Sequence, residues 1–113
     1  MNNYQEIIEN QLAMNQISWQ KLVQNGLTSD DEVRLDFWYY TTNKENAESL
    51  KVFLQNETDY EVSIEASNNS VRSINGQTQK TEISLAILNE WVEWMVLAGQ
   101  EFECQFDGWG VQL

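Results

Sequence analysis

The residues of this chain that are able to do chemistry are its carboxylates and a single cysteine. Asp30, Asp31, Glu32 and Asp36 lie close together in the sequence, and clustered oxygen atoms are what hard divalent cations bind. Their spacing matches no calcium-binding loop, so a solvated turn before a strand is the better interpretation, and no metal is expected. Cys104 has no histidine to activate it, because the chain contains none, and we expect a small core residue there.

The absence of histidine also removes several classes of active site. No serine can form a hydrolase triad without one, and no set of His and Cys residues is available to bind zinc. The sequence has no glycine-rich phosphate-binding loop either. Paired carboxylates are able to act as general acid and base, but nothing in the sequence singles out a pair. We therefore expect that the protein is not an enzyme and that it needs no cofactor.

Charge is the strongest signal in the composition. Eighteen acidic residues oppose six basic ones, which gives a net charge of −12. Such a surface repels a phosphate backbone, so direct binding of nucleic acid is disfavoured. Two interpretations remain. The excess acid keeps a small protein soluble, or it attracts a basic protein partner and accelerates the encounter.

The length of 113 residues predicts a single domain over 1–113 that is large enough to bury its own core. One cysteine cannot form an intrachain disulfide, which favours a reducing compartment. The first residues lack the basic start of a secretory signal, and no apolar run reaches the ~18 residues that a membrane span needs. We therefore expect a cytoplasmic protein without a membrane segment.

Three segments have the periodicity of helices. The first, about 3–25, carries one apolar stripe that Asn15 interrupts and ends near Gly26, a typical C-terminal cap; the stripe consists of Ile8, Leu12, Trp19, Leu22 and Val23. The second starts at a capping box, Thr42-x-x-Glu45, and runs to about residue 56. The third, 81–99, is apolar around most of its surface, so we expect the sheet on one side of it and the first helix on another.

Four segments alternate between apolar and polar residues as strands do. They are "EVRLDFWYY" (32–40), "YEVSIEA" (60–66), the short "SVRSI" (70–74) and "ECQFDGW" (103–109). "SNNS" (67–70) predicts a hairpin turn between the second and third. The alternation places Cys104 and Phe106 on one face of the last strand, and Asp107 and Trp109 on the other.

This order of elements predicts an α+β fold. After the N-terminal helix, a core at about 32–112 reads β-α-β-β-α-β, which indicates a ferredoxin-like sandwich with a four-stranded antiparallel sheet and both core helices on one face. The other face would be open. By the alternation it would carry three large rings among carboxylates: Trp38, Tyr40 and Trp109 amid Asp36, Glu61, Glu65, Glu103 and Asp107.

The segment "FDGWG", Phe106 to Gly110, resembles the Tyr-Asp-Gly-Trp-Gly signature that closes the domain of the regulator of ribonuclease E activity B (RraB) family, a group of small acidic bacterial proteins. "LAGQEFECQFDGWG" and "NGLTSDDEVRLDFWYY" are similar to further parts of that family's pattern. Phe106 stands where the family usually has tyrosine. The resemblance implies a ferredoxin-like domain that binds the endoribonuclease E and inhibits it, which changes RNA turnover without contact with RNA.

We predict a partner-binding surface formed by Asp36, Trp38, Tyr40, Asp107 and Trp109. Each ring also has an architectural interpretation. Gly108 and Gly110 allow Trp109 to fold back into the core, and the N-terminal helix is able to cover Trp38 and Tyr40. A self-association surface is another use of an open face. An alternative function is an immunity-type or nucleic-acid-mimic protein that neutralises a basic toxin or a DNA- or RNA-handling enzyme.

Overall fold

The computed structural model describes residues 3–28, 31–66 and 70–112. Along these ranges the chain forms an α+β fold with the following elements in order: α1 (Asn3–Gln24), β1 (Glu32–Thr41), α2 (Lys44–Glu57), β2 (Glu61–Ala66), β3 (Arg72–Gln77), β4 (Thr81–Glu82), α3 (Leu85–Glu101) and β5 (Gln105–Gln112). The strands lie in the order β2-β3-β1-β5, and every pair is antiparallel. The predicted ferredoxin-like order is confirmed, with the two-residue β4 added beside the start of β1.

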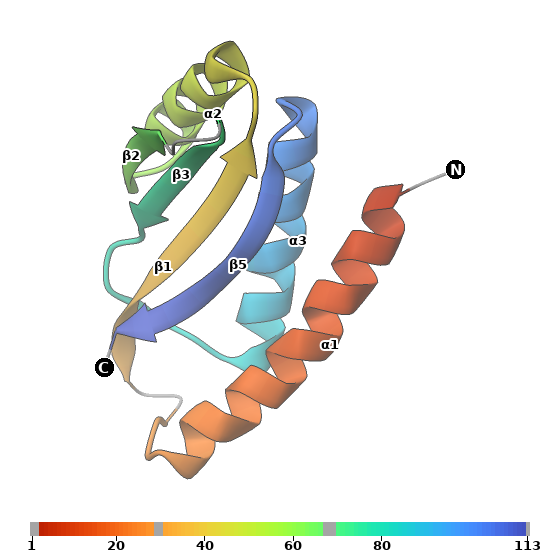
Figure 1. The fold of residues 1–113 in the computed structure, drawn as a ribbon. Helices are drawn as coiled ribbons and strands as arrows, with labels where there is room; N and C mark the ends of the chain where they lie inside the picture. The colour runs from red at the N-terminus through yellow and green to blue at the C-terminus, as the bar shows by residue number, and fades with distance from the viewer. Residues whose placement is uncertain (1–2, 29–30, 67–69, 113) are drawn as a thin grey trace.

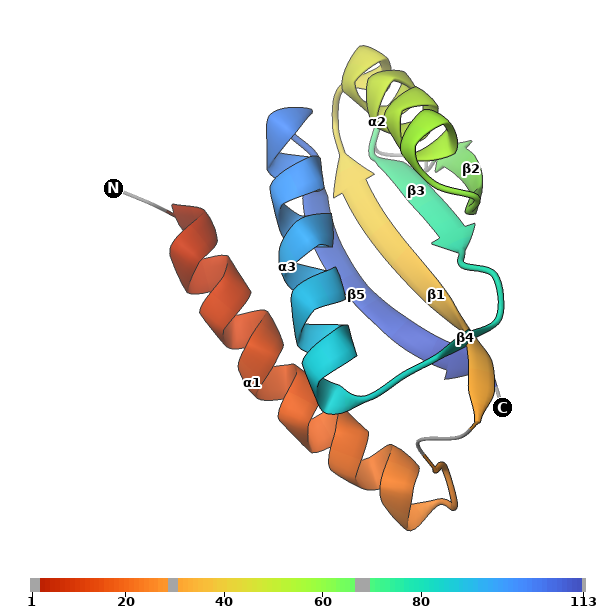
Figure 2. The same ribbon diagram turned by 180° about the vertical axis from the view of Figure 1, so that it is seen from behind.

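The helices lie together on one side of the sheet (Figures 1 and 2). α2 and α3 cover that face, and α1 lies alongside α3, farther from the sheet's centre. No helix of the described chain covers the opposite face, so the alternative in which the N-terminal helix shields Trp38 and Tyr40 is wrong. The sheet therefore has one packed face and one open face.

The core forms where β1 meets α3. Phe37 and Tyr39 are completely buried on the packed face, and the Tyr39 hydroxyl donates a hydrogen bond of 2.6 Å to the backbone carbonyl of Met95. The ring of Phe37 lies over Gly76 of β3, where an added Cβ would be 2.2 Å from the ring and 2.7 Å from the Glu61 carbonyl oxygen. Gly76 is thus required by the close approach of an aromatic ring and a neighbouring strand.

A buried polar contact fixes α1 against the rest of the molecule. Asn15 is completely buried; its Nδ2 donates to Oδ1 of Asn89 on α3 at 3.1 Å, and its Oδ1 accepts from the indole nitrogen of Trp109 on β5 at 2.7 Å. The residue that interrupts the apolar stripe is therefore the one that joins three elements. The predicted stripe is wrong at one end, because Val23 is 48% exposed.

Several predicted boundaries shift for local reasons. The N-cap of α2 is Asn43, whose side chain accepts from the backbone N–H of Asn46, and not Thr42. Residues 81–82 pair with β1 as a strand, and α3 begins only after Ser84, whose hydroxyl caps it. β3 continues to Gln77, beyond the predicted 70–74. The β2–β3 pairing is present, but residues 67–69 of the predicted turn lie outside the described residues.

Candidate functional site

The open face of the sheet carries the exposed rings of β1. Trp38 is 38% exposed and Tyr40 is 40% exposed, while the residues between and beside them in the chain are buried. In the strand register Trp38 lies between Asn75 of β3 and Gly108 of β5. Two large aromatic side chains therefore stand on an uncovered surface, as the alternation in β1 predicts.

Trp109, by contrast, does not lie on this face, and that part of the prediction is wrong. The β1–β5 register shifts between Trp38 and Tyr39, so that Trp38 pairs with Gly108 while Tyr39 pairs with Phe106. Asp107 is the extra residue of a β-bulge, which reverses the alternation after it. Trp109 is therefore opposite Phe37 on the packed face, where it contacts both groups of buried residues.

The two glycines of the signature flank this inward ring, and each has a different reason to lack a side chain. Gly108 has a φ of 154°, in the region that favours glycine. At Gly110 an added Cβ would be 3.2 Å from the outer edge of the Trp38 indole. The absence of a side chain there leaves room for the Trp38 ring beside β5, so the sequence DGWG places one indole inside and accommodates another outside.

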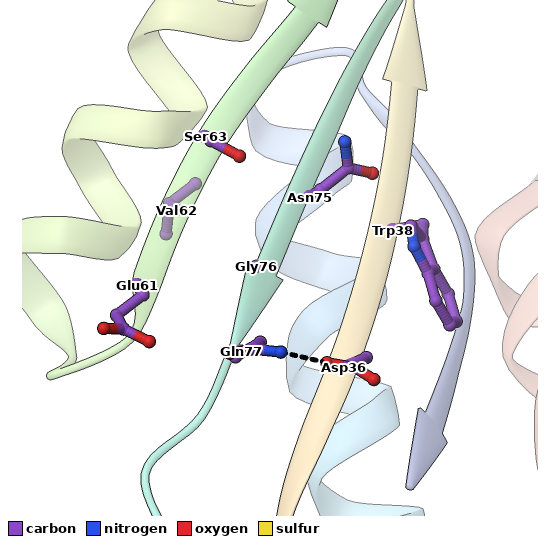
Figure 3. A pocket seen from close by; sticks show the side chains of 8 residues that line it. All are labelled: Asp36, Trp38, Glu61, Val62, Ser63, Asn75, Gly76 and Gln77. Atoms are coloured by element: carbon purple, nitrogen blue, oxygen red, sulfur yellow. Dashed lines mark hydrogen bonds between the residues drawn. The ribbon is translucent and has the colours of Figure 1, made fainter. Parts of the chain in front are cut away.

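A shallow hollow of about 430 Å³ lies beside Trp38 (Figure 3). Its lining comes from β1, β2 and β3: Asp36, Trp38, Glu61, Val62, Ser63, Asn75, Gly76 and Gln77. Within it Gln77 Nε2 donates a hydrogen bond of 2.8 Å to Oδ1 of Asp36. The hollow thus presents an indole, carboxylates and amides on one surface, which suits recognition of a cationic side chain.

The charge of the face is mainly negative. Asp36 and Glu61 line the hollow, and Glu65 and Asp107 are exposed. Arg34 forms an ion pair with Glu61 and its Nε donates to the carbonyl of Thr78 at 3.0 Å.

Glu103 does not belong to this face. It precedes β5, has a φ of 56°, and its side chain accepts a hydrogen bond from Asn46 of α2. Of the carboxylates predicted on the open surface, this one is misplaced.

The acidic residues before β1 form a turn. The Asp31 carboxylate accepts from the backbone N–H of Thr28 at 2.9 Å; Asp30 lies outside the described residues. Among the residues that the structure describes, no group of three or more His, Cys, Asp or Glu side chains is placed to hold a metal ion. No helix of the described chain is long and apolar enough to cross a membrane.

Cys104 is buried on the packed side, as predicted. Burial raises the pKa of its thiol from 9.0 to about 11, the main opposing effect being a hydrogen bond with Thr41. The thiolate fraction at neutral pH is therefore very small, which disfavours a nucleophilic role for this residue.

We expect the protein to lose stability as the pH rises above 9. The Cys104 thiol ionises near pH 9 in the unfolded state but only near pH 11 in the folded state, so the folded state holds the proton more tightly. The stability that this difference contributes is lost as the pH rises from 9 to 11. Burial also raises the pKa of Tyr39 above its ordinary 10.0, which adds a loss that begins about one unit higher. Urea midpoints between pH 7 and 11 should show Cys104→Ala losing less stability than the parent between pH 9 and 10. Equal losses would contradict the assignment.

Comparison with known proteins places the chain in a family. A family model described as "Regulator of ribonuclease activity B" matches residues 12–111, from the second half of α1 through β5. A search of curated proteins found no match. The matched range includes Asn15, the rings of β1 and the bulged DGWG segment, so the match covers the elements that build both faces of the sheet. The chain belongs to the regulator of ribonuclease activity B (RraB) family.

Proposed function

We propose that this protein binds ribonuclease E through the open face of its sheet and lowers the activity of the enzyme by protein contact alone. The observation that carries the proposal is an uncovered face with two exposed rings among carboxylates, in a chain whose family is named for regulating ribonuclease activity. The family name concerns regulation rather than a catalysed reaction, which agrees with a protein that is not itself an enzyme.

The rings supply the anchors of the proposed contact. Trp and Tyr are enriched among the residues that dominate binding energies. Trp38 is held against the glycine backbone of β5, so it loses little conformational freedom on binding. Tyr40 lies on the same strand face, and Asp36 lines the hollow beside Trp38. These three residues, with Asp107 at the bulge, form the proposed docking surface, whereas Trp109 supports it from the packed side.

Charge decides which kind of partner fits. A chain with a net charge of −12 repels RNA but attracts a segment rich in Lys and Arg. We propose that such a segment of ribonuclease E is the target. Residues that engage carboxylates of the regulator are no longer available to the phosphates of RNA, so the enzyme would lose substrate affinity without any change in its catalytic groups.

The test is the affinity for purified ribonuclease E. Trp38→Ala is expected to weaken binding by about 30-fold, or about 2 kcal/mol, as is typical of a buried aromatic anchor. Ile17→Ala is the matched control, since Ile17 is 57% exposed on α1. The association rate of the parent should fall strongly as salt is raised, because the charges are exposed and screening shortens their reach.

Equal affinities of the Trp38→Ala and Ile17→Ala variants would contradict the proposed surface, and a salt-independent association rate would contradict the role of charge. Failure to bind ribonuclease E at low salt, with capture of a basic nuclease toxin instead, would favour the immunity-type alternative.

A further inference from the structure

A second group of exposed apolar side chains, which includes the ring of Trp94, lies on the helix side of the molecule, away from the open sheet face. Seen from that side, α2 and α3 run in front of the sheet (Figure 2). Val52 of α2 is 51% exposed, and Ile87 and Trp94 of α3 are 46% and 39% exposed. Phe53 and Trp94 stack with ring centroids 6.0 Å apart and planes inclined by 23°, so the stack bridges the two helices near the surface.

Hollows lie on either side of this stack. One of about 430 Å³ is bounded by Val52, Phe53 and Phe102. The other, of about 550 Å³, is bounded by residues that include Tyr60, Ile87, Trp91 and Trp94. We call the two hollows and the stack between them the α2–α3 groove.

Closure of the core does not depend on the Trp94 ring, the exposed ring of the groove. Leu50 and Leu54 of α2 and Val92 and Met95 of α3 are completely buried beneath it. Trp94 is partly exposed outside that layer and makes its ring contact with Phe53, which is itself half-buried. A monomer gains little from large apolar side chains in such positions, and contiguous exposed apolar surface commonly marks an interaction site.

The charge around the groove identifies the occupant. Glu48 lines one hollow, and Glu57 and Glu90 line the other. Among the described residues that bound these two hollows, none is lysine or arginine. Lys80 lines an adjoining hollow of about 260 Å³, which shares Tyr60, Ile87 and Trp91 with the second hollow, and the Asp59 carboxylate offsets its charge there.

This charge disfavours the other occupants. A second copy would bring the same glutamates and a further net charge of −12 into contact, and juxtaposed like charges oppose association. Anionic lipid headgroups would be repelled in the same way. The apolar floor with acidic sides instead matches the apolar face and basic flanks of an amphipathic helix.

We infer that the α2–α3 groove is a second docking surface, which binds a basic amphipathic helix of another protein. The apolar face of that helix lies on Phe53, Trp94 and Ile87, and its Lys and Arg side chains reach Glu48, Glu57 and Glu90. Because the open sheet face is on the other side of the sheet, both surfaces are accessible at once. The protein then acts as a two-sided adapter, and this second contact does not depend on ribonuclease E being the first.

The test uses a synthetic amphipathic peptide of about 18 residues, with Leu and Phe on one face and Lys and Arg on the other. A scrambled peptide of the same composition is the control for charge alone. Binding to the full chain is measured by calorimetry, and the contact is mapped from backbone amide chemical shifts. We expect saturable binding of the amphipathic peptide, with shifts at Val52, Phe53, Ile87 and Trp94.

Variants separate the groove from the rest of the surface. Trp94→Ala should weaken peptide binding by at least ~10-fold, while Ile17→Ala leaves it within about twofold. Glu90→Lys reverses an exposed charge on the rim without removing any apolar contact, so it decides the question if Trp94→Ala does not fold. It should weaken binding several-fold, whereas Glu6→Lys, an exposed site on α1, should not.

Three outcomes would overturn the inference. The first is equal binding of the scrambled peptide, and the second is a set of shifts centred on Trp38 and Tyr40. The third is a concentration-dependent dimer that Trp94→Ala abolishes, because a second copy would then be the occupant.

Discussion

Replacing Trp109 with alanine is expected to lower the free energy of unfolding by about 4 kcal/mol. The indole contacts both groups of buried residues, so its removal leaves a cavity where β5, α1 and the core meet. The substitution also removes the indole N–H that donates to Oδ1 of Asn15, a completely buried residue. The side-chain oxygen is then an unsatisfied buried acceptor, which adds to the loss of stability. Urea unfolding followed by circular dichroism measures the change.

Trp38→Ala is the matched control for this prediction. Trp38 and Trp109 are the same residue type on adjacent strands but on opposite faces of the sheet. Trp38→Ala should leave most of the stability intact and weaken ribonuclease E binding, whereas Trp109→Ala should destabilise the fold. Trp109→Phe retains much of the packing but not the hydrogen bond, so its cost should be intermediate. A Trp109→Ala protein as stable as Trp38→Ala would show that the ring is not architectural.

Gly76→Ala is expected to destabilise the protein by about 3 kcal/mol, although it adds a single methyl group. The new Cβ would be 2.2 Å from the Phe37 ring and 2.7 Å from the Glu61 carbonyl oxygen. The ring is enclosed by the core, and the carbonyl belongs to the neighbouring strand of the sheet, so neither is free to move away. Thermal or urea unfolding of the variant measures the loss.

Asn75→Ala is the control for Gly76→Ala, because Asn75 is the preceding residue of β3 and points to the open face. Its cost should be under about 1 kcal/mol. In the double variant with Phe37→Leu, the smaller side chain at 37 should relieve part of the overlap. The loss of unfolding free energy in the double variant should therefore be smaller than the sum of the losses in the two single variants. Strict additivity would mean that the Phe37 contact is not the cause.

Much of the fold follows from local patterns in the sequence. The alternation in β1 correctly separates Phe37 and Tyr39 from Trp38 and Tyr40, because one face of a strand is buried here and the other is not. The apolar surface of the 81–99 segment correctly predicts cover from both the sheet and α1. These patterns are strong because burial dictates them residue by residue.

The placement of Trp109 shows where such patterns fail. Assigning alternate residues to opposite faces through Asp107 assumes an unbroken strand. The bulge inserts one residue, so every side chain after it lies on the face opposite to the one predicted. Gly108 within a strand was the available signal, because an isolated strand glycine often marks a bulge. The register of β5 with β1 depends on pairing partners more than sixty residues earlier in the chain. A short stretch of sequence around Gly108 does not contain those partners.

Asn15 illustrates a second limit. A polar residue within an apolar stripe reads as a defect of the stripe, and only the folded arrangement shows that Asn89 and Trp109 satisfy it. The misassigned cap of α2 is a smaller instance. Thr42 and Asn43 are both good capping residues, and the path of the chain out of β1 selects between them.

The bond between Asn15 and Trp109 joins residues 94 positions apart, and this separation sets the order in which a nascent chain acquires its structure. α1 is synthesised before the other described elements, yet the strand that supplies its Trp109 partner is synthesised after all of them. β1 likewise waits for β5 along one of its edges. Until translation reaches β5, the emerging chain therefore has one edge of β1 unpaired and the Asn15 side-chain oxygen without its indole donor, and exposed strand edges and incomplete packing of this kind are what chaperones protect.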